Sequence, residues 1–289
     1  MNGKIHSKAL LNGLMKRFTQ MNIHSTSVEE YRVAFAKMIE FFRFIAHKIP
    51  VGIKVHRIRI HNGETEFTHL KELWCPPAHM TTMGRLNEKG DQILYTSSGG
   101  DTAYRELNPP VGSIVSCLEC EVIEPILSVD IGLLKYNPNR EGFLKQWAFD
   151  NAKGLKIVYQ NNKELMAIDT RLKEFMITQF VRSVPKGSEH LYRLTAAIAK
   201  QFFLSKDLEA ISYPSIKSQM RDINFAFPAH VALKKLKPIR IDVHEILPSA
   251  SGSNLTRVLP IKGCYENLNF EDALVYTNPR EIIGWATKD

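Results

Sequence analysis

A long run of helix-forming sequence separates two strand-forming regions in this chain of 289 residues. Strand patterns extend from Val51 to about Ile131 and return at Ala210, whereas residues from about Asn139 to Leu204 are predicted to be mostly helical. Strands at both ends of a helical block are typical of a mixed α+β fold and not of a regular β-α-β series. We therefore predict the α+β class.

The first fifty residues are predicted to form an additional helical segment. The stretch Ser27-Val28-Glu29-Glu30 has the capping-box form, which satisfies backbone N–H groups at a helix start. Apolar residues then recur at helical spacing, and Pro50 is predicted to end the helix. The chain is accordingly divided into residues 1–50 and a larger domain, residues 51–289.

The composition is that of a globular protein with a basic surplus. Hydrophobic residues make up 44% and charged residues 24%, which excludes a disordered or collagen-like chain. The net charge of +8 raises nucleic-acid binding as an alternative. However, the basic residues are scattered, and the nearest cluster is Lys234, Lys235, Lys237 and Arg240. Such a short run is more typical of a solvated helix end, so nucleic acid is not expected as the partner.

No segment has the apolar character of a signal peptide or the apolar length of a membrane span. We therefore expect a soluble, cytoplasmic protein with no membrane partner. The four cysteines include one C-x-x-C, Cys117 and Cys120, within a predicted strand. Residues three apart on a strand face opposite ways, and no second pair completes a zinc site, so no metal is expected.

Several common active-site motifs are missing from the sequence. It contains no G-x-G fingerprint, P-loop, H-E-x-x-H motif or G-x-S-x-G nucleophile elbow. What remains is a series of polar residues beside predicted strands: Arg57, Arg59, Gly84-Arg85-Leu86-Asn87, Tyr95, Glu106 and Tyr213-Pro214-Ser215. Each alone has an ordinary structural explanation, as a strand, loop, core or helix-cap residue. Their order along the chain is more informative than any one of them.

This order resembles the RES domain, a family named for an arginine, a glutamate and a serine. Its members carry an Arg on an early strand, a proline-containing loop and a Gly-Arg-aromatic-Asn turn. A strand ending in Leu-Tyr, a short helix with the Glu and, much later, Tyr-Pro-Ser follow. The matching segments here are His56-Arg57-Ile58-Arg59, Pro76-Pro77, Gly84-Arg85-Leu86-Asn87, Ile93-Leu94-Tyr95, Ala103-Tyr104-Arg105-Glu106 and Ile211-Ser212-Tyr213-Pro214-Ser215. The spacing from Arg85 through Tyr95 to Glu106 is the most specific part, and the resemblance covers about residues 51–130 and 207–250.

The sequence departs from the family pattern in three places. Leu86 stands where the family usually has an aromatic residue, and both Arg57 and Arg59 match the first arginine, of which we favour Arg57. The gap of 109 positions from Glu106 to Ser215 exceeds that of compact members. The helical block at about 139–205 is therefore expected to be an insertion, and residues 1–50 an addition.

The resemblance implies a mixed β core like that of ADP-ribosyltransferases, and NAD⁺ as substrate. Small family members are toxins that destroy NAD⁺, some by phosphorolysis, and a partner antitoxin neutralises them. The expected activity is cleavage of the nicotinamide–ribose bond, with water, inorganic phosphate or a protein side chain as acceptor. Tyr104 stands two positions before Glu106, where some arginine-modifying enzymes have a second carboxylate, so consumption of free NAD⁺ ranks above protein ADP-ribosylation. A non-catalytic protein that binds NAD⁺ or ADP-ribose is a further alternative.

Three of the matching residues are assigned to the reaction itself. Cleavage of the nicotinamide–ribose bond passes through an oxocarbenium-like state, as glycoside hydrolysis does. We assign Glu106 to stabilise that positive charge and Ser215 to orient Glu106 or a ribose hydroxyl. Tyr95 offers a ring that can pack on nicotinamide or ribose, together with a hydroxyl for a polar contact.

The remaining matches are assigned to substrate binding. A pyrophosphate is best bound by the bidentate donors of arginine, so Arg57 or Arg59 and Arg85 are assigned to it. Asn87 is expected to hold the loop that carries Arg85 by bonding to its backbone. With Tyr95, these residues complete the predicted binding set.

Overall fold

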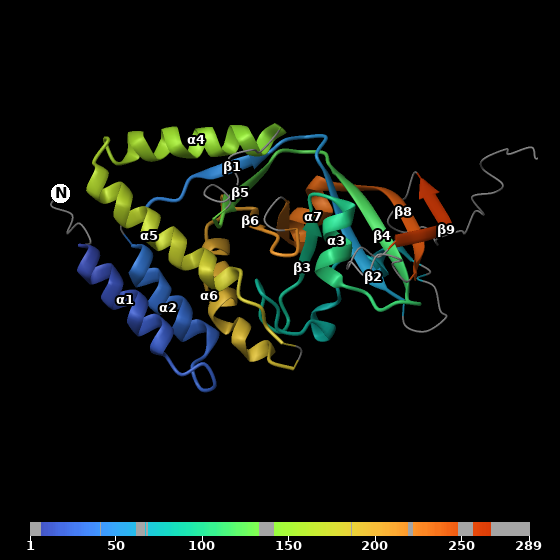
Figure 1. The fold of residues 1–289 in the computed structure, drawn as a ribbon, viewed down its shortest axis with the longest axis horizontal. Helices are drawn as coiled ribbons and strands as arrows, with labels where there is room; N and C mark the ends of the chain where they lie inside the picture. The colour runs from blue at the N-terminus through green and yellow to red at the C-terminus, as the bar shows by residue number, and fades with distance from the viewer. Residues whose placement is uncertain are drawn as a thin grey trace, which may run out of the picture.

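The computed structural model describes residues 7–40, 42–61, 67, 69–132, 142–185, 187–218, 222–247 and 257–266. In this part of the chain, nine strands form one sheet flanked by helices, a mixed α+β fold as predicted (Figure 1). In sheet order the strands are β1 (Ala46–Ile49), β5 (Ile126–Asp130), β6 (Ala210–Pro214), β7 (Ile223–Pro228), β3 (Ile93–Ser97), β2 (Lys54–Ile60), β4 (Ile114–Val122), β8 (Leu236–Leu247) and β9 (Arg257–Glu266).

The helical block connects two neighbouring strands. Strands β5 and β6 pair in parallel, and parallel strands need a long crossover connection. That crossover consists of α4 (Gly142–Val158), α5 (Lys163–Phe180), the 3-10 helix η4 (Glu189–Tyr192) and α6 (Arg193–Phe203). The block that the sequence marks as an insertion is therefore the link within a strand pair of the sheet.

The N-terminal segment packs against this block. The capping box at Ser27 is confirmed, since Ser27 accepts from the Glu30 N–H while the Glu30 side chain accepts from the Ser27 N–H. It starts α2 (Val28–Ile39), which follows α1 (Lys8–Gln20). Phe18, Tyr31 and Phe35 are buried with residues of α5 and α6 in one apolar cluster, and the four helices lie together in Figure 1.

The expected end of the second helix at Pro50 is wrong. Helix α2 ends at Ile39, and Ala46–Ile49 pair antiparallel with β5 as strand β1. His47 and Ile49 are buried on either side of the exposed Lys48, an alternation that suits a strand. Pairing with β5 therefore overrides the helical spacing of the apolar residues before it.

The other half of the sheet is built from β2, β4, β8 and β9. The short helix α3 (Gly100–Leu107) packs on β2, and α7 (Ala229–Lys235) joins β7 to β8. Cys117 and Cys120 of β4 lie in two different apolar clusters, as their spacing predicts. Within the described ranges, no helix is both long enough and apolar enough to cross a bilayer.

The sheet opens between β2 and β3. Strand β2 pairs with β4 over its whole length, and β3 pairs with β7 over its whole length. Between β2 and β3, a single Cα pair, His56 with Ser97, continues the sheet in the part that the structure describes. The two strands therefore diverge, and the space between them is where the candidate site lies.

Candidate active site

A pocket of about 410 Å³ lies where β2 and β3 diverge, bordered by α3. We call it the β2–β3 pocket. Four of the residues predicted from the sequence line it, namely Arg57, Arg85, Tyr95 and Glu106. Its wall also includes His56 and Tyr213, which lie in matching segments but had no assigned role, and Ser97, Tyr192 and Asn224, which were not predicted. The fold thus brings together residues that are up to 168 positions apart in the chain.

Glu106 is held at one of its two carboxylate oxygens. Oε1 accepts a hydrogen bond of 2.6 Å from Ser215 Oγ and one of 2.8 Å from Asn224 Nδ2. Oε2 accepts no hydrogen bond from the residues that the structure describes. The residue is exposed, whereas Ser215 behind it is completely buried. Ser215 therefore has the predicted orienting position, and Oε2 is the oxygen left for a ligand.

The helix that carries Glu106 is set by its ends. It begins after Gly99, and Asp101 lies in its first turn, where its negative charge suits the helix dipole. At the other end Asn108 adopts a left-handed conformation with φ 48°, and its N–H bonds to Tyr104. Pro109 and Pro110 follow, so the helix stops just past Glu106.

Asn224 was missed because its strand was missed. It lies on β7, is 5% exposed, and sits opposite Ser97 of β3 and Tyr213 of β6. Ser97 Oγ donates to Asn224 Oδ1 at 2.6 Å. The signal was available in the run Ile223-Asn224-Phe225-Ala226-Phe227, because a lone amide in a buried apolar strand requires a polar partner.

The structure separates the two arginines of β2. Arg57 lines the pocket, and its Nη1 donates to the Tyr95 carbonyl across the opening at 3.3 Å. Burial, together with the nearby charge of Arg59, lowers the pKa of Arg57 to about 10, so it stays a cation at neutral pH. Arg59 instead donates to the Glu72 carbonyl and stacks 5.2 Å from the Phe67 ring centroid, and it is not part of the pocket lining.

Arg85 is anchored by the helical block. Its Nη1 donates to the carbonyls of Phe180 and Arg182 at the end of α5, the second at 3.2 Å. Its guanidinium lies 5.3 Å from the ring centroid of Tyr192 in η4. These contacts use one terminal nitrogen, and the other guanidinium nitrogens make no hydrogen bond within the described part of the chain. The helical block therefore contributes both an anchor and a ring to the pocket.

Asn87 supports the turn that presents Arg85, and it does not line the pocket. Its amide donates to the carbonyls of Thr82 and Glu88 at 2.8 and 2.7 Å. Its Oδ1 accepts from the Tyr95 hydroxyl at 2.8 Å. A Cβ on Gly84 would lie only 2.4 Å from that Oδ1, which explains why glycine starts the turn. Asn87 is thus placed as the expected loop support and not as a ligand contact.

Two tyrosines of the pocket lining, Tyr95 and Tyr213, are neutral phenols. The Tyr95 hydroxyl accepts from the Leu86 N–H at 2.9 Å, and burial raises its pKa well above the ordinary value. Burial likewise raises the pKa of Tyr213. Leu86 itself is 2% exposed and packs in the core, so the position where the family usually has an aromatic residue offers no ring to the pocket. Tyr192 supplies one from another part of the chain.

His56 gives the pocket an uncharged imidazole on its β2 side. Its Nε2 lies 3.5 Å from Glu119 Oε2 on β4, and Glu119 also binds Lys54. Burial lowers the pKa of His56, and this outweighs the attraction of Glu119. The cationic groups of the lining are therefore the two arginines, while its carboxylate is that of Glu106.

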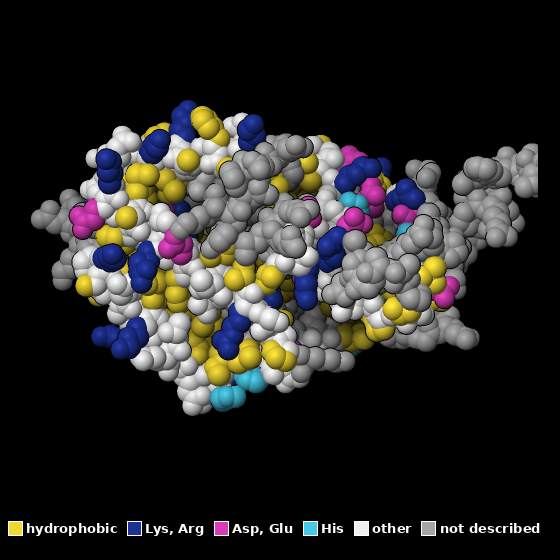
Figure 2. Space-filling view, viewed as in Figure 1, with side chains coloured by type: hydrophobic (Ala, Val, Ile, Leu, Met, Phe, Trp, Pro, Cys, Tyr) yellow, Lys and Arg dark blue, Asp and Glu magenta, His cyan; other side chains and the backbone are white. Residues whose placement is uncertain are grey.

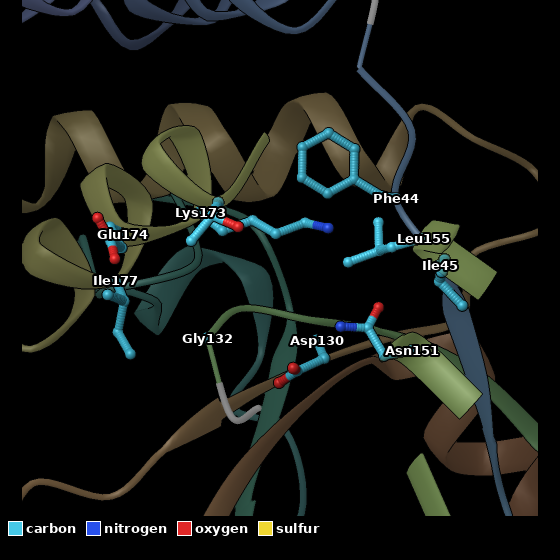
Figure 3. Close-up of a pocket in the computed structure, with 10 residues that line it drawn as sticks. Phe44, Ile45, Asp130, Gly132, Asn151, Leu155, Lys173, Glu174 and Ile177 are labelled. Carbon is cyan, nitrogen blue, oxygen red and sulfur yellow. The ribbon is translucent and has the colours of Figure 1, made fainter. Parts of the chain in front are cut away.

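A second cavity, of about 220 Å³, lies between α4, α5 and the end of β5. We call it the α4–α5 cavity. Figure 3 shows Lys173 extending across it toward Phe44 and Leu155, with Asp130 and Asn151 on the other side. Lys173 forms an ion pair of 2.8 Å with the fully buried Asp169. None of the residues predicted from the sequence lines this cavity.

Metal ligands, the Cys75 thiol and surface charge in the described part of the chain do not suggest a different site. No three His, Cys, Asp or Glu side chains converge there as metal ligands. Burial raises the pKa of the Cys75 thiol to about 11, which leaves it protonated and a poor nucleophile. On the face seen in Figure 2, Lys and Arg side chains are spread over several elements instead of gathering in one patch.

Comparisons with known proteins add no assignment. No protein-family model matches the chain, and no curated protein matches it. The case for a function therefore rests on the order of residues in the sequence and on the geometry of the β2–β3 pocket.

Proposed function

We propose that the protein is a cytoplasmic enzyme with an ADP-ribosyltransferase-like core that consumes NAD⁺ by cleaving its nicotinamide–ribose bond. The observation that carries the proposal is the carboxylate of Glu106, fixed at Oε1 by Ser215 and Asn224, in a pocket with two arginines. A fixed carboxylate beside anchored guanidinium groups suits NAD⁺. Its pyrophosphate is negatively charged, and its ribose develops positive charge as the bond breaks.

Glu106 is the residue that we assign to the bond-breaking step. As nicotinamide leaves, positive charge develops on the ribose, and a preorganised carboxylate stabilises it without having to reorient. Oε2 is the oxygen available for this, because Oε1 is occupied by its two donors. Ser215 acts by holding Glu106; its hydroxyl hydrogen is engaged with Oε1, which does not suit a nucleophile.

Arg57 and Arg85 are suited to bind the pyrophosphate. Each is tied down through Nη1 to backbone carbonyls, which leaves further N–H donors in a fixed position. Arginine offers paired donors that match phosphate oxygens, and carbonyl anchoring leaves its positive charge intact. We assign Arg57, and not Arg59, to this task because Arg57 alone of the two lines the pocket.

The acceptor that we favour is water or inorganic phosphate, with a toxin-like depletion of free NAD⁺ as the result. Tyr104, two positions before Glu106, is buried against Ile58 and Cys117 and does not reach the pocket lining. The position that carries a carboxylate in some arginine-modifying enzymes is therefore part of the core. Loss of NAD⁺ would harm the cell that contains the enzyme, so we also propose a neutralising protein partner.

The test is an NAD⁺ consumption assay, with and without phosphate, that resolves the products by mass. Wild-type protein is expected to release nicotinamide with ADP-ribose or its 1″-phosphate, and Glu106→Gln to be slower by at least about 100-fold. Glu124→Gln, which changes an exposed carboxylate outside the pocket, should match wild type. If NAD⁺ stays intact both with and without phosphate, the proposed cleavage of NAD⁺ is refuted. Binding of NAD⁺ measured by calorimetry would in that case indicate a non-catalytic binding protein.

A further inference from the structure

Asn224 forms the middle of a chain of hydrogen bonds that ends at Glu106. Ser97 Oγ donates to Asn224 Oδ1 at 2.6 Å, and Asn224 Nδ2 donates to Glu106 Oε1 at 2.8 Å. Both Ser97 and Asn224 are about 95% buried, and they face each other across paired strands. A buried polar chain of this kind persists only if each member is satisfied.

The hydrogen-bonding capacity of Glu106 fixes which way the Asn224 side-chain amide points. A carboxylate only accepts hydrogen bonds, so the group facing Glu106 must be the NH₂ of Asn224. Its carbonyl then faces Ser97, whose hydroxyl can donate to it. Glu106 thus sets the orientation of the Asn224 amide, and the Ser97 hydroxyl supports it by donating to the amide oxygen.

Two donors on one oxygen constrain Glu106 more than one would. Ser215 comes from the end of β6 and Asn224 from β7, so they approach Oε1 from two elements of the sheet. With both in place, the carboxylate cannot rotate to exchange its oxygens without losing a hydrogen bond. The exposure of Glu106 makes such restraint necessary, because an exposed side chain is otherwise free to change rotamer.

We propose that Asn224 is a positioning residue that keeps Glu106 turned with Oε2 toward the bound substrate. This inference rests on the proposed cleavage of NAD⁺ and adds the residue that sets the geometry of its carboxylate. Asn224 acts through Glu106, so its loss is expected to lower kcat while leaving KM for NAD⁺ nearly unchanged.

The decisive variant is Asn224→Asp, which has the same shape but places a second carboxyl against Oε1. We expect kcat at neutral pH to fall by about 10- to 100-fold, because two adjacent carboxylates repel each other. The loss should shrink at acid pH, where one shared proton allows the new carboxyl to donate to Glu106. The other titratable groups of the pocket lining, His56, Arg57, Arg85, Tyr95, Tyr192 and Tyr213, are the same in both proteins.

A matched control is Asn151→Asp, which makes the same substitution at a buried amide of α4 beside the α4–α5 cavity. It should leave kcat and its pH profile as in wild type. Ser97→Ala, which removes the hydrogen bond to the Asn224 amide oxygen, should lower kcat by about 3- to 10-fold with KM retained. The kcat of Ser97→Ala provides a second test of the role of Asn224 if Asn224→Asp does not fold.

The outcomes separate this inference from the proposed function. Wild-type turnover together with an unchanged kcat in Asn224→Asp, or in Ser97→Ala where the former does not fold, would overturn the role of Asn224 alone. A lower kcat in Asn224→Asp with a deficit that is constant across pH would likewise refute it, since that is the result of a merely structural defect. Absence of turnover in wild type would instead refute the proposed function itself.

Discussion

The two cavities both contain charged side chains, but they hold them in opposite ways. Lys173, which lines the α4–α5 cavity, is paired at 2.8 Å with the fully buried Asp169 behind it, and each neutralises the other. In the β2–β3 pocket, the arginines are bound by carbonyls and Glu106 by a hydroxyl and an amide. Neutral partners fix the position of a charge without cancelling it.

This difference separates charges that maintain the fold from charges that are available to a ligand. A buried ion pair stabilises mainly by avoiding an unpaired charge, and it offers little to a third group. A charge held by dipoles keeps most of its field, which is the condition for electrostatic stabilisation of a transition state. The comparison therefore predicts that mutations in the two cavities affect different properties.

The largest effect is expected for stability, at Asp169. Asp169→Ala removes the partner of Lys173 and the acceptor of the Tyr159 hydroxyl, and it does so at a fully buried position. Leaving the Lys173 ammonium group unpaired should lower the free energy of unfolding by about 3 kcal/mol. Chemical denaturation measures this. NAD⁺ turnover at low temperature, where the variant is folded, should equal that of wild type; a large loss of turnover would break the comparison.

A smaller effect, confined to activity, is expected for Ser215→Ala. The variant loses a hydrogen bond to a carboxylate, which contributes about 1.5–3 kcal/mol, and kcat should fall by about 10- to 100-fold. Because Glu106 is exposed, the free energy of unfolding should change less than in Asp169→Ala. Steady-state kinetics and denaturation on the same samples compare the two. Ser212→Ala, which removes a buried hydroxyl on β6 away from the pocket lining, is the control.

Next in size is the difference between the two arginines of β2. Arg57→Lys should raise KM for NAD⁺ by about 10-fold, because lysine cannot reproduce paired donors to a pyrophosphate. Arg59→Lys, which changes a contact with the Glu72 carbonyl and the Phe67 ring, should leave KM within about 2-fold of wild type. Equal KM values in the two variants would refute the assignment of Arg57, and not Arg59, to the pyrophosphate.

Site residues that follow one another at a recognisable spacing could be predicted from the sequence. Site residues that reach the pocket only through the order of the strands in the sheet could not. Arg85, Tyr95 and Glu106 follow one another at recognisable spacing, and the structure places all three in one pocket. Asn224 and Tyr192 reach the same pocket from β7 and η4, whose positions depend on which strands become neighbours. Strand order is a non-local property, and periodicity along the chain does not specify it.

The secondary structure shows the same division. The capping box of α2 and the strand around Tyr95 depend on local residues, and both were predicted. Strand β1 was predicted as helix because its four residues are extended only through pairing with β5. The choice between Arg57 and Arg59 likewise needed the divergence of β2 from β3, which leaves one of the two facing the opening.

A modest effect is expected from the ring that the helical block contributes. Tyr192→Leu removes the surface on which Arg85 stacks, and it should raise KM for NAD⁺ by about 3- to 5-fold, in line with the energy of an exposed cation–π contact. Tyr192→Phe keeps the ring and should restore wild-type KM. His190→Ala, in the same short helix but outside the pocket lining, tests whether disturbing η4 suffices; a KM as high as that of Tyr192→Leu would refute the role of the ring.

The smallest effect concerns pH and the buried histidines. Burial lowers the pKa of His47, near α4, and of His56, in the pocket wall, so both are favoured as neutral groups in the folded protein. Each must take up a proton more readily once unfolded, so their contribution is complete above the ordinary histidine pKa and is lost as pH falls below it. The free energy of unfolding should therefore decline from about pH 7 to pH 5.

His47→Gln and His56→Gln should each flatten this decline, and only His56→Gln should also alter NAD⁺ turnover, because only His56 lines the pocket. A slope that neither substitution changes would assign the acid sensitivity to other groups.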